Sequence, residues 1–444
     1  LCSRCGRTDK GSETMILFKG DLYHSKDQEI ILNQLEDEIN KTRRTKMLNP
    51  EKVIVALEKL GQSIAEGEFD ALISQLNIEG IEKHIDIILM SLKRENIEYK
   101  VKTELGEHYF DIQKTDPPFN QKKLWIRPMP LGTLLHIAAG NIDGLPVFSV
   151  AEGLITGNVN ILKLPQADKG LSIKIIKKLI EIEPDISDFV YIFDTPSSDL
   201  HAIKKMAEMA DGIVVWGGDA AISAVRQFAP VGCKLIEWGH KLGFAYISGY
   251  EDKEKELTAL AEHIISTRQL LCSSCQTIFL DTNSQEELHA FCEEFLPYLE
   301  VAADKYPFQS IDVIAERTLQ KYYEKLDNII SGSAIRNDRV YKGKHCSLTI
   351  CPDKNLELSD MFGNCLVKGL PRSELFSTLR KHKGYLQTAG LICQRERREE
   401  LTDLLARSGV VRIMRAGDMS SAFCGEAHDG EYALRRYTRI VNIQ

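Results

Sequence analysis

The sequence predicts an α/β protein with two large lobes, of which the first contains a doubly wound parallel sheet. Between residues 132 and 236, short apolar runs alternate with helical stretches through Gly-rich turns. Helices between successive strands supply the long crossover connections that a parallel sheet requires. A similar alternation resumes after residue 249, and 444 residues with 43% hydrophobic content suffice for two or three lobes with large cores.

Residues 1–105 are expected to form a helical N-terminal region, and 106–128 a hairpin excursion around Asp116-Pro117-Pro118. Helical spacing is visible at Ile30, Ile31, Leu35 and Ile39. Cys2 and Cys5 share C-x-x-C spacing, but a structural zinc site needs further ligands, and His24 alone is a poor supplement. We therefore expect no metal there.

Residues 129–248 are expected to form a nucleotide-binding domain. The predicted strands are 133–137, 159–164, 190–193, 212–215 and 234–236. The predicted helices between them lie near 144–156, 169–182, 198–209 and 219–228. Ligands of such sheets bind beyond the carboxyl ends of the strands, so residues that follow each strand are candidates for a site.

Residues 249–420 are expected to form a second α/β domain, and 421–444 a terminal segment. The predicted helices lie near 253–271, 284–302 and 311–327, and the predicted strands near 276–280, 347–350, 365–367 and 389–392. The last predicted strand, 435–443, is isolated. It must find a sheet edge, because its backbone polar groups otherwise lose their partners on burial.

The composition excludes several classes of function. The chain has 56 Lys and Arg against 64 Asp and Glu, and its basic residues are scattered, so we expect no binding to nucleic acid or to anionic membranes. The most apolar long stretch, 131–159, is interrupted by polar residues and glycines, which predicts no membrane insertion, and no signal peptide is expected. Eleven cysteines without framework spacing indicate a reducing cytoplasm.

A second C-x-x-C pair, Cys272 and Cys275, lies where a predicted helix gives way to a strand. A cysteine at such a boundary can face a cleft, and nucleophilic attack needs a thiolate that local donors or positive potential stabilise. The alternative is that both cysteines are packed thiols, as free buried cysteines usually are.

Short motifs occur in a fixed order along residues 130–370. They are Ala139-Gly140-Asn141, Gly157-Asn158-Val159-Asn160-Ile161-Leu162-Lys163, Trp216-Gly217-Gly218, Glu237-Trp238-Gly239-His240-Lys241, the cysteine segment and Met361-Phe362-Gly363. In this order the sequence resembles the aldehyde dehydrogenase superfamily. With the tail Gly425-Glu426-Ala427-His428-Asp429-Gly430 and Arg436-Tyr437, it looks most like the long-chain acyl-CoA (acyl-protein) reductases of bacterial luminescence operons. The resemblance implies an aldehyde-dehydrogenase-like fold.

The resemblance implies that Cys272 is the nucleophile, because it stands seven residues before the aromatic Phe279 of the following strand. Cys275 would put that strand out of register. The sequence departs from the family at Leu270, where a glutamine is usual, and Gln269 stands one residue earlier.

Two further catalytic residues are implied by the resemblance. Asn141 would supply a side-chain amide to the oxyanion, together with the backbone N–H of Cys272; taken alone, it could instead cap a helix. Glu237, 35 residues before Cys272, would be a general base, a proton relay or a group that tunes the cysteine. The alternative for Glu237 is a surface carboxylate in a turn.

A nicotinamide cofactor is also implied. Lys163 would reach the adenosine ribose, and Gly217-Gly218 would let the backbone approach the pyrophosphate near a helix N-terminus. Gln166 stands where NAD-preferring members often place a carboxylate that repels a 2′-phosphate, which favours NADPH (NADP). The remaining implied contacts are Asp360, one methylene shorter than the usual glutamate, and Phe362.

Three functions are compatible with these residues. In the first, Cys272 takes a long-chain fatty acyl group from acyl-CoA or an acyl-carrying protein, and NADPH reduces the thioester to the aldehyde. The second is an NAD(P)-dependent aldehyde dehydrogenase that forms the acid, and the third is a non-catalytic scaffold of an acyl-transfer complex. The tail motif and the missing glutamine favour the first function, whereas intact Asn141, Glu237 and Cys272 disfavour the third.

The resemblance also implies partners. An acyl-protein synthetase and an acyl-transferase could deliver the acyl group, and the aldehyde could serve luminescence. In the superfamily the terminal strand pairs with a hairpin of a neighbouring subunit. We therefore expect a homo-oligomer in which residues 435–443 of one chain pair with residues near 110–128 of another.

Overall fold

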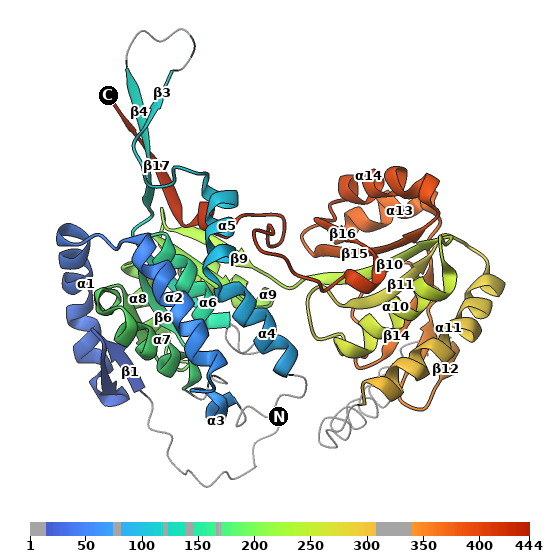
Figure 1. Cartoon of the computed structure of the whole chain (residues 1–444). Coiled ribbons are helices and arrows are strands. Elements are labelled where there is room, and N and C mark those ends of the chain that lie inside the picture. Colours follow the sequence, from blue (N-terminus) through green and yellow to red (C-terminus); the bar gives the residue numbers. More distant parts are fainter. Residues whose placement is uncertain are drawn as a thin grey trace. The chain divides into compact units, whose positions relative to one another are not determined.

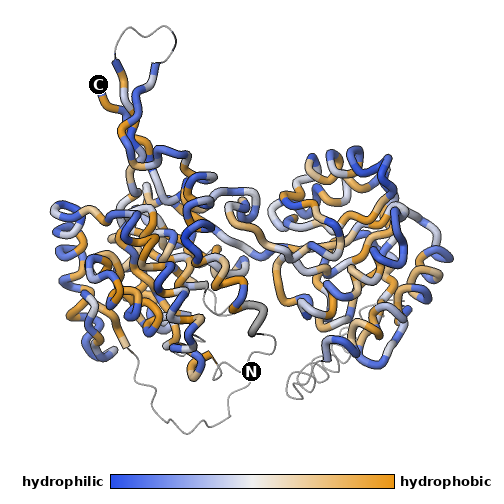
Figure 2. The backbone as a smooth tube through the Cα atoms, viewed as in Figure 1, coloured by the Kyte–Doolittle hydropathy of each residue, from blue (hydrophilic) through white to orange (hydrophobic). Residues whose placement is uncertain are grey.

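The computed structural model describes the chain except for residues 1–14, 74–80, 117, 119–122, 139–144, 166–167, 169 and 308–338. The chain forms two compact units, Leu1–Gly239 with Phe423–Gln444, and His240–Ala422 (Figure 1). Hydrophobic residues concentrate along the central strands of each unit and alternate with hydrophilic ones along the covering helices (Figure 2). The predicted α/β fold with parallel sheets is confirmed.

The first unit contains a seven-stranded sheet with the order β2-β1-β7-β6-β5-β8-β9. Its last five strands in this order are parallel, and the order reverses beside β5, as in a doubly wound sheet. The strands are β1 (Met15–Phe18), β2 (Asp21–His24), β5 (Thr133–Ile137), β6 (Val159–Lys163), β7 (Val190–Phe193), β8 (Gly212–Trp216) and β9 (Lys234–Trp238). All five strands predicted for this sheet are present.

The hairpin formed by β1 and β2 corrects the expectation that residues 1–105 are helical. Strand β1 pairs antiparallel with β2 and with β7, so it extends the parallel sheet. Its sequence, Met15 to Phe18, is one short apolar run, and three of its four residues are buried. A run of four residues has no period that distinguishes a strand from a helix.

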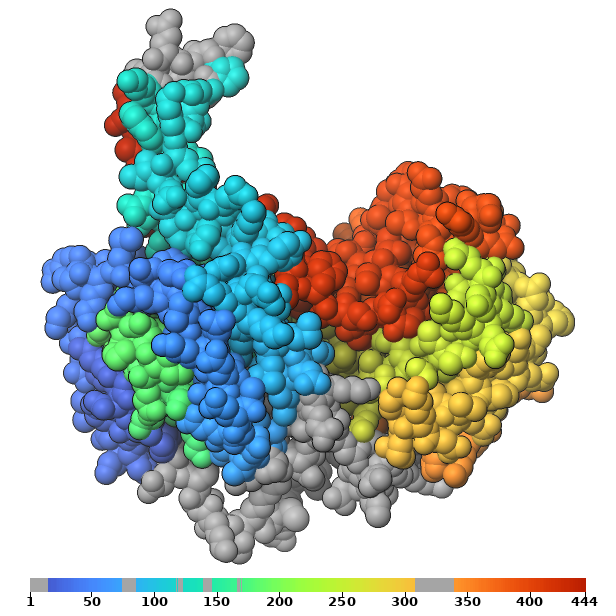
Figure 3. Space-filling view, viewed as in Figure 1, coloured from blue at the N-terminus to red at the C-terminus, as the bar shows by residue number. Residues whose placement is uncertain are grey.

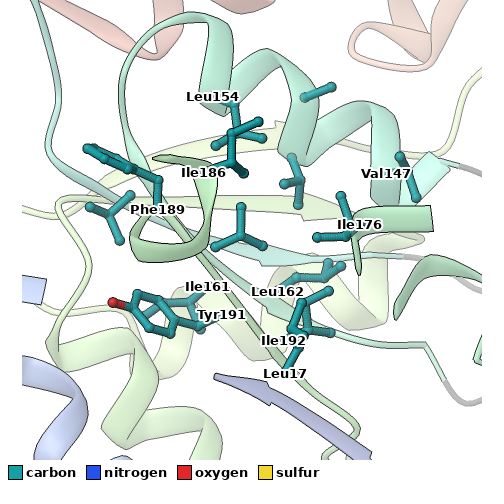
Figure 4. Close-up of a cluster of buried hydrophobic side chains, with 14 of the residues drawn as sticks. Leu17, Val147, Leu154, Ile161, Leu162, Ile176, Ile186, Phe189, Tyr191 and Ile192 are labelled. Atoms are coloured by element: carbon teal, nitrogen blue, oxygen red, sulfur yellow. The ribbon is translucent and has the colours of Figure 1, made fainter. Parts of the chain in front are cut away.

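The helices of the first unit cover its sheet. They are α1 (Gln28–Thr45), α2 (Pro50–Ala65), α3 (Asp70–Ile73), α4 (Ile81–Leu92), α5 (Arg94–Leu105), α6 (Leu145–Ile155), α7 (Leu171–Ile182), α8 (Leu200–Glu208), α9 (Asp219–Phe228) and α15 (Ala433–Arg436). Helix α2 packs on α6 and α7, and α1 packs on α8. Figure 4 shows part of the resulting core, where Ile161, Tyr191 and Ile192 of the strands meet Leu154 and Ile176 of the helices.

A separate three-stranded sheet belongs to the first unit and has the order β17-β4-β3. Its strands are β3 (Gln113–Thr115), β4 (Leu124–Pro130) and β17 (Thr438–Ile443). Strand β17 pairs antiparallel with β4 of its own chain, from Thr438 opposite Pro130 to Ile443 opposite Trp125. Figure 3 shows these C-terminal residues, in red, against the teal segment of β4.

This pairing corrects the expectation that the terminal strand pairs with a neighbouring subunit. Residues 438–443 pair on one side with β4 of the same chain, because α15 carries the segment directly alongside β4, and β17 is the edge strand of this sheet. The pairing of the terminal strand with β4 therefore needs no second subunit.

The second unit contains a seven-stranded sheet with the order β12-β13-β14-β11-β10-β15-β16, in which β12 alone is antiparallel to its neighbour. The strands are β10 (Leu242–Ser248), β11 (Cys275–Leu280), β12 (Arg339–Lys342), β13 (Ser347–Ile350), β14 (Asn364–Gly369), β15 (Leu386–Cys393) and β16 (Arg412–Met414). The helices described are α10 (Lys253–Ser266), α11 (Gln285–Lys305), α13 (Arg372–Leu379) and α14 (Arg398–Ser408). The helix expected near 311–327 lies outside the described residues.

Strand β10 places the start of the second unit before the expected boundary at 249. All seven residues of β10 are buried, and the strand pairs with β11 and β15 at the middle of the second sheet. The sequence interpretation had included these residues in the first domain. No helix within the described ranges is long and apolar enough to cross a bilayer.

Candidate active site

The loop of residues 267–274 joins α10 to β11 and presents Cys272. Arg268 and Gln269 have φ values of 54° and 59°, which is an uncommon left-handed backbone for residues with side chains. The Leu270 N–H donates to the Thr267 carbonyl at 3.1 Å, which tightens this turn. Such backbone persists only where surrounding contacts hold it.

Gln269 supplies many of these contacts. Its side chain is 1% exposed, and its Nε2 donates to the carbonyl oxygen of Cys275 at 2.8 Å and to Oγ of Ser359 at 3.0 Å. Its Oε1 accepts from the Gly363 N–H at 3.0 Å. The Gln269 carbonyl oxygen in turn accepts from Nε2 of Gln276 at 2.7 Å. Gln269 thus ties the cysteine loop to β11 and to residues 359–363.

The two cysteines of this segment lie in different environments. Cys275 is the first residue of β11 and is fully buried, and burial raises the pKa of its thiol to about 12. Cys272 is half-buried on the loop, and its Sγ lies 3.3 Å from Nε2 of Gln387. A thiol with a pKa near 12 is almost entirely protonated at neutral pH, so Cys275 is a poor nucleophile.

Hydroxyl and imidazole groups hold the remainder of the loop. Oγ of Ser274 donates to Oγ1 of Thr267 at 3.1 Å and accepts from the Leu271 N–H at 3.2 Å. Nε2 of His263 accepts from the Cys275 N–H at 3.3 Å. Burial lowers the pKa of His263 to about 4, so the imidazole is neutral and can accept this bond.

Strand β10 accommodates the loop because it carries Gly243. The register of β10 shifts at this glycine against both β11 and β15, which marks a β-bulge. A Cβ atom on Gly243 would stand 2.5 Å from the carbonyl oxygen of Ser274 and 2.8 Å from that of Ser273. Only glycine permits this approach without a shift of backbone.

The segment that contains Asp360 and Phe362 lies beside the cysteine loop in the second unit. The Phe362 N–H donates to the Arg268 carbonyl at 3.0 Å, and both Met361 and Phe362 have positive φ. Phe362 is half-buried and Asp360 is exposed. The structure therefore brings Phe362 and the Cys272 loop together within one unit.

In the first unit, Lys163, Gly217 and Gly218 follow or end parallel strands at one edge of the sheet. Nζ of Lys163, the last residue of β6, donates to Oγ of Ser197 at 2.9 Å. Lys163 is 4% exposed, and burial lowers its pKa. Gly217 follows β8, and Gly218 is the N-cap of α9.

Glu237, near the end of β9, lies at the same edge and has a charged partner. Nε and Nη2 of Arg226 donate to its two carboxylate oxygens, each at 2.6 Å. The Glu237 side chain is 22% exposed and that of Arg226 62%. This bidentate pair engages both carboxylate oxygens, so Glu237 can turn to another group only when the pair opens.

The sequence interpretation missed an aromatic cluster at this edge. Trp216 and Trp238 end neighbouring strands, and their rings stack at 5.3 Å between centroids. The ring of His428 lies 5.3 Å from Trp216 and 5.1 Å from Trp238. All three residues belong to quoted motifs, but their contact joins segments that lie far apart in the sequence. Asn141 and Gln166, the other implied residues of this lobe, lie outside the described residues.

Known structures share this fold. Aldehyde dehydrogenase 21 from Physcomitrella patens, in complex with the reaction product succinate, is 12% identical, with a TM-score of 0.71, and the alignment covers 97% of this chain and 94% of that chain. Betaine aldehyde dehydrogenase from Staphylococcus aureus, in complex with NAD⁺, is 13% identical, with a TM-score of 0.67, and the alignment covers 94% of this chain and 87% of that chain. The fold is that of the aldehyde dehydrogenases.

Sequence comparison gives the family. The model of the acyl-CoA reductase (LuxC) family matches residues 47–440, and the chain belongs to this family. A long-chain acyl-protein thioester reductase from Photorhabdus luminescens is 25% identical over 349 residues, which cover 77% of this chain and 69% of that relative.

Proposed function

We propose that the protein reduces a long-chain fatty acyl thioester, carried by CoA or by a protein, to the fatty aldehyde. The family and the name of the relative from Photorhabdus luminescens support the acyl thioester as substrate. The observation that carries the proposal for this chain is the difference in burial among its cysteine thiols. Among the described cysteines of the second unit, all are buried except Cys272.

In the proposed reaction, the Cys272 thiolate attacks the thioester carbonyl carbon. A carbon–sulfur bond to Cys272 forms, and the bond to the carrier sulfur breaks, so that the carrier leaves as a thiolate. We infer that Asn141 and the Cys272 backbone N–H stabilise the negative charge on the carbonyl oxygen. After reduction, the carbonyl re-forms, the carbon–sulfur bond to Cys272 breaks with its electron pair on sulfur, and the aldehyde is released.

The residues of the first unit fit a dinucleotide. We propose that Lys163 holds the ribose and that Gly217-Gly218 admit the pyrophosphate at the start of α9. Asp360 and Phe362 remain candidates for cofactor contacts by resemblance. When bound, the reduced nicotinamide supplies the hydride. A Cβ on Gly218 would meet no atom within 4 Å, so there is space beside this helix start. Gln166 would not repel a 2′-phosphate, which favours NADPH.

Two measurements test the proposed function. Incubation with palmitoyl-CoA in the absence of NADPH should leave one acyl group, and peptide mapping by mass spectrometry should place it on Cys272. Addition of NADPH should then release the aldehyde and oxidise NADPH in proportion to the acyl-CoA consumed, whereas free palmitate should give no oxidation. An acyl group on another cysteine, or oxidation of aldehyde to acid without any acyl-CoA reduction, would contradict the proposal.

A further inference from the structure

The sulfur of Cys272 has a hydrogen-bond donor on another strand. Gln387, the second residue of β15, is 5% exposed, and its Nε2 lies 3.3 Å from the Cys272 Sγ. Its Oε1 accepts a hydrogen bond from Oγ1 of Thr388 at 3.3 Å. In this orientation the amide oxygen faces Oγ1 of Thr388, and the amide nitrogen, which carries two N–H groups, faces the sulfur.

We propose that Gln387 is a catalytic residue that donates a hydrogen bond to the Cys272 sulfur and stabilises it as a thiolate. The reaction in which the Cys272 thiolate takes part rests on the proposed function. The effect of Gln387 on the Cys272 thiol does not depend on that function. A hydrogen bond to a charged group is stronger than one between neutral groups. The hydrogen bond from Gln387 therefore favours the thiolate of Cys272 over the thiol.

The topology of the second sheet explains why these two residues meet. Strands β11, β10 and β15 are neighbours and parallel, so Cys272, which precedes β11, and Gln387, which begins β15, lie at the same edge on either side of β10. The start of β10 lies between them. The bulge at Gly243 lets the cysteine loop cross this strand closely, because no Cβ obstructs the carbonyl groups of Ser273 and Ser274.

The bond acts at two points of the proposed reaction. Before acyl transfer, it raises the thiolate fraction available to attack the thioester carbonyl. After reduction, the carbon–sulfur bond breaks, and its electron pair returns to the Cys272 sulfur as the carbonyl re-forms. The same donor then stabilises the leaving thiolate, so loss of Gln387 should slow both acyl transfer and aldehyde release.

Neighbouring elements contribute neutral and charged groups near this edge. Lys241, directly before β10, donates from Nζ to the Gly384 carbonyl at 2.8 Å. His263 of α10 binds the Cys275 N–H, and burial lowers its pKa to about 4, so it carries no charge at neutral pH. Arg412 of β16 donates from Nη1 to the carbonyl of Met419 at 2.5 Å and from Nη2 to the carbonyl of Ser421. None of these hydrogen bonds involves the Gln387 side chain, so we expect its substitution to leave these groups in place and a change in Cys272 reactivity to report the loss of the amide.

The test compares Gln387→Leu and Gln387→Glu with the full-length wild type. Gln387→Leu removes the donor, and Gln387→Glu keeps the size but places an acceptor beside the sulfur. The rate of alkylation of Cys272 by iodoacetamide is measured from pH 6 to 10 by mass spectrometry of its peptide. We expect Gln387→Leu to slow alkylation at pH 7 roughly 10-fold or more and to raise the apparent pKa by about one unit, with a larger shift in Gln387→Glu. Gln394→Leu, on the exposed residue directly after β15, is the matched control and should match wild type.

Activity separates this inference from the proposed function. Single-turnover acyl transfer from palmitoyl-CoA should slow by a factor similar to that for alkylation. Equal pH profiles of alkylation in folded Gln387→Glu, Gln387→Leu and wild type would overturn the role of Gln387. A different result is possible: the alkylation profiles of the variants are shifted, but the wild type takes no acyl group from acyl-CoA. This result would support the role of Gln387 and overturn the proposed function.

Discussion

The backbone of Gly243 lies so close to that of Ser274 that a methyl group on Gly243 would stand 2.5 Å from the Ser274 carbonyl oxygen. The atom in conflict belongs to the backbone, so it cannot rotate away as a flexible side chain would. The position of the Cys272 loop therefore depends on a glycine in a different element, β10.

Gly243→Ala should displace the cysteine loop while most of the second unit stays folded. We expect a loss of about 1–3 kcal/mol in the free energy of unfolding, the usual result of overpacking, and a larger relative loss of turnover. Chemical denaturation and steady-state rates on the same preparation measure the two effects. Turnover equal to that of wild type would mean that the loop tolerates this displacement.

Cys272→Ser should abolish reductase turnover, whereas Cys275→Ser should retain most of it. A serine hydroxyl cannot replace a thiolate without a dedicated base. The Cys275 thiol is buried and has its pKa raised to about 12, so it offers almost no thiolate to a substrate. Steady-state NADPH oxidation with palmitoyl-CoA measures both variants. If Cys275→Ser were inactive and Cys272→Ser remained active, the nucleophile would be Cys275 and this prediction would be wrong.

Gln269→Leu should destabilise the second unit by roughly 2–4 kcal/mol, because it leaves the buried Gly363 N–H and the Cys275 carbonyl without their side-chain partner. Its sequence neighbour provides a matched control. Leu270 is 54% exposed, so Leu270→Gln should change the free energy of unfolding by less than about 0.5 kcal/mol. Denaturant unfolding followed by circular dichroism compares the two variants, and equal midpoints would contradict the role of Gln269.

Acid should destabilise the first unit partly through His136. Its ring is buried between Oγ of Ser149, at 2.7 Å, and Oδ1 of Asn160, at 3.0 Å, and burial lowers its pKa to about 4. The unfolded chain, with a pKa near 6.5, binds a proton in this range and the folded chain does not, so stability falls as the pH drops from about 6.5 to 4.

The size of this effect is about 3 kcal/mol at pH 4. His136→Gln can keep hydrogen bonds to both neighbours without titrating, so the difference in unfolding free energy between wild type and variant should depend on pH in this window. All three tryptophans of the chain, Trp125, Trp216 and Trp238, lie in the first unit, and their fluorescence follows its unfolding separately. A difference that stays constant from pH 7 to 4 would show that His136 protonates freely in the folded state.

Removal of β17 should abolish self-association. Ile440, Val441 and Ile443 are 57%, 36% and 36% exposed on the three-stranded sheet, and a second copy that covers these side chains would remove their apolar surface from water. We expect the full chain to be a homo-oligomer by light scattering and a chain that ends at Tyr437 to be monomeric or aggregated. A monomeric full chain, or a truncated chain with the mass of the full oligomer, would contradict this expectation.

Local pattern was sufficient for most of the fold. The strand predicted at 190–193 and the helix predicted at 219–228 have the bounds found in the structure, because each is an apolar or amphipathic segment between clear turn residues. Strand β10 was missed although it is fully buried, because its run Leu242 to Ser248 follows β9 after a short turn and reads as a continuation of the first sheet. Its membership in the second sheet depends on pairing with β11 and β15, which no local pattern encodes.

The candidate site shows the same difference between features that a local pattern predicts and features that depend on long-range contacts. Cys272 was selected by its spacing from Phe279, and spacing along one loop can be read from a sequence. Gln387 could not be selected, because it stands more than a hundred residues later in an ordinary apolar strand. The departure at Leu270 is explained in part: Gln269, one residue earlier, uses a left-handed backbone to turn its amide into the interior.

The first unit is discontinuous, and this has a consequence for synthesis. Oε2 of Glu104 accepts from the Leu434 N–H at 2.8 Å, and Nδ2 of Asn158 donates to the Tyr437 carbonyl at 3.0 Å. Leu434 and Tyr437 leave the ribosome only after the whole of the second unit has been made. Until then, β4 lacks its partner β17 and the buried carboxylate of Glu104 lacks the Leu434 N–H. The second unit, which is continuous in sequence, can already fold during this time. We expect the newly made chain to depend most on chaperones in this interval, and its final cooperative step to be the docking of residues 423–444.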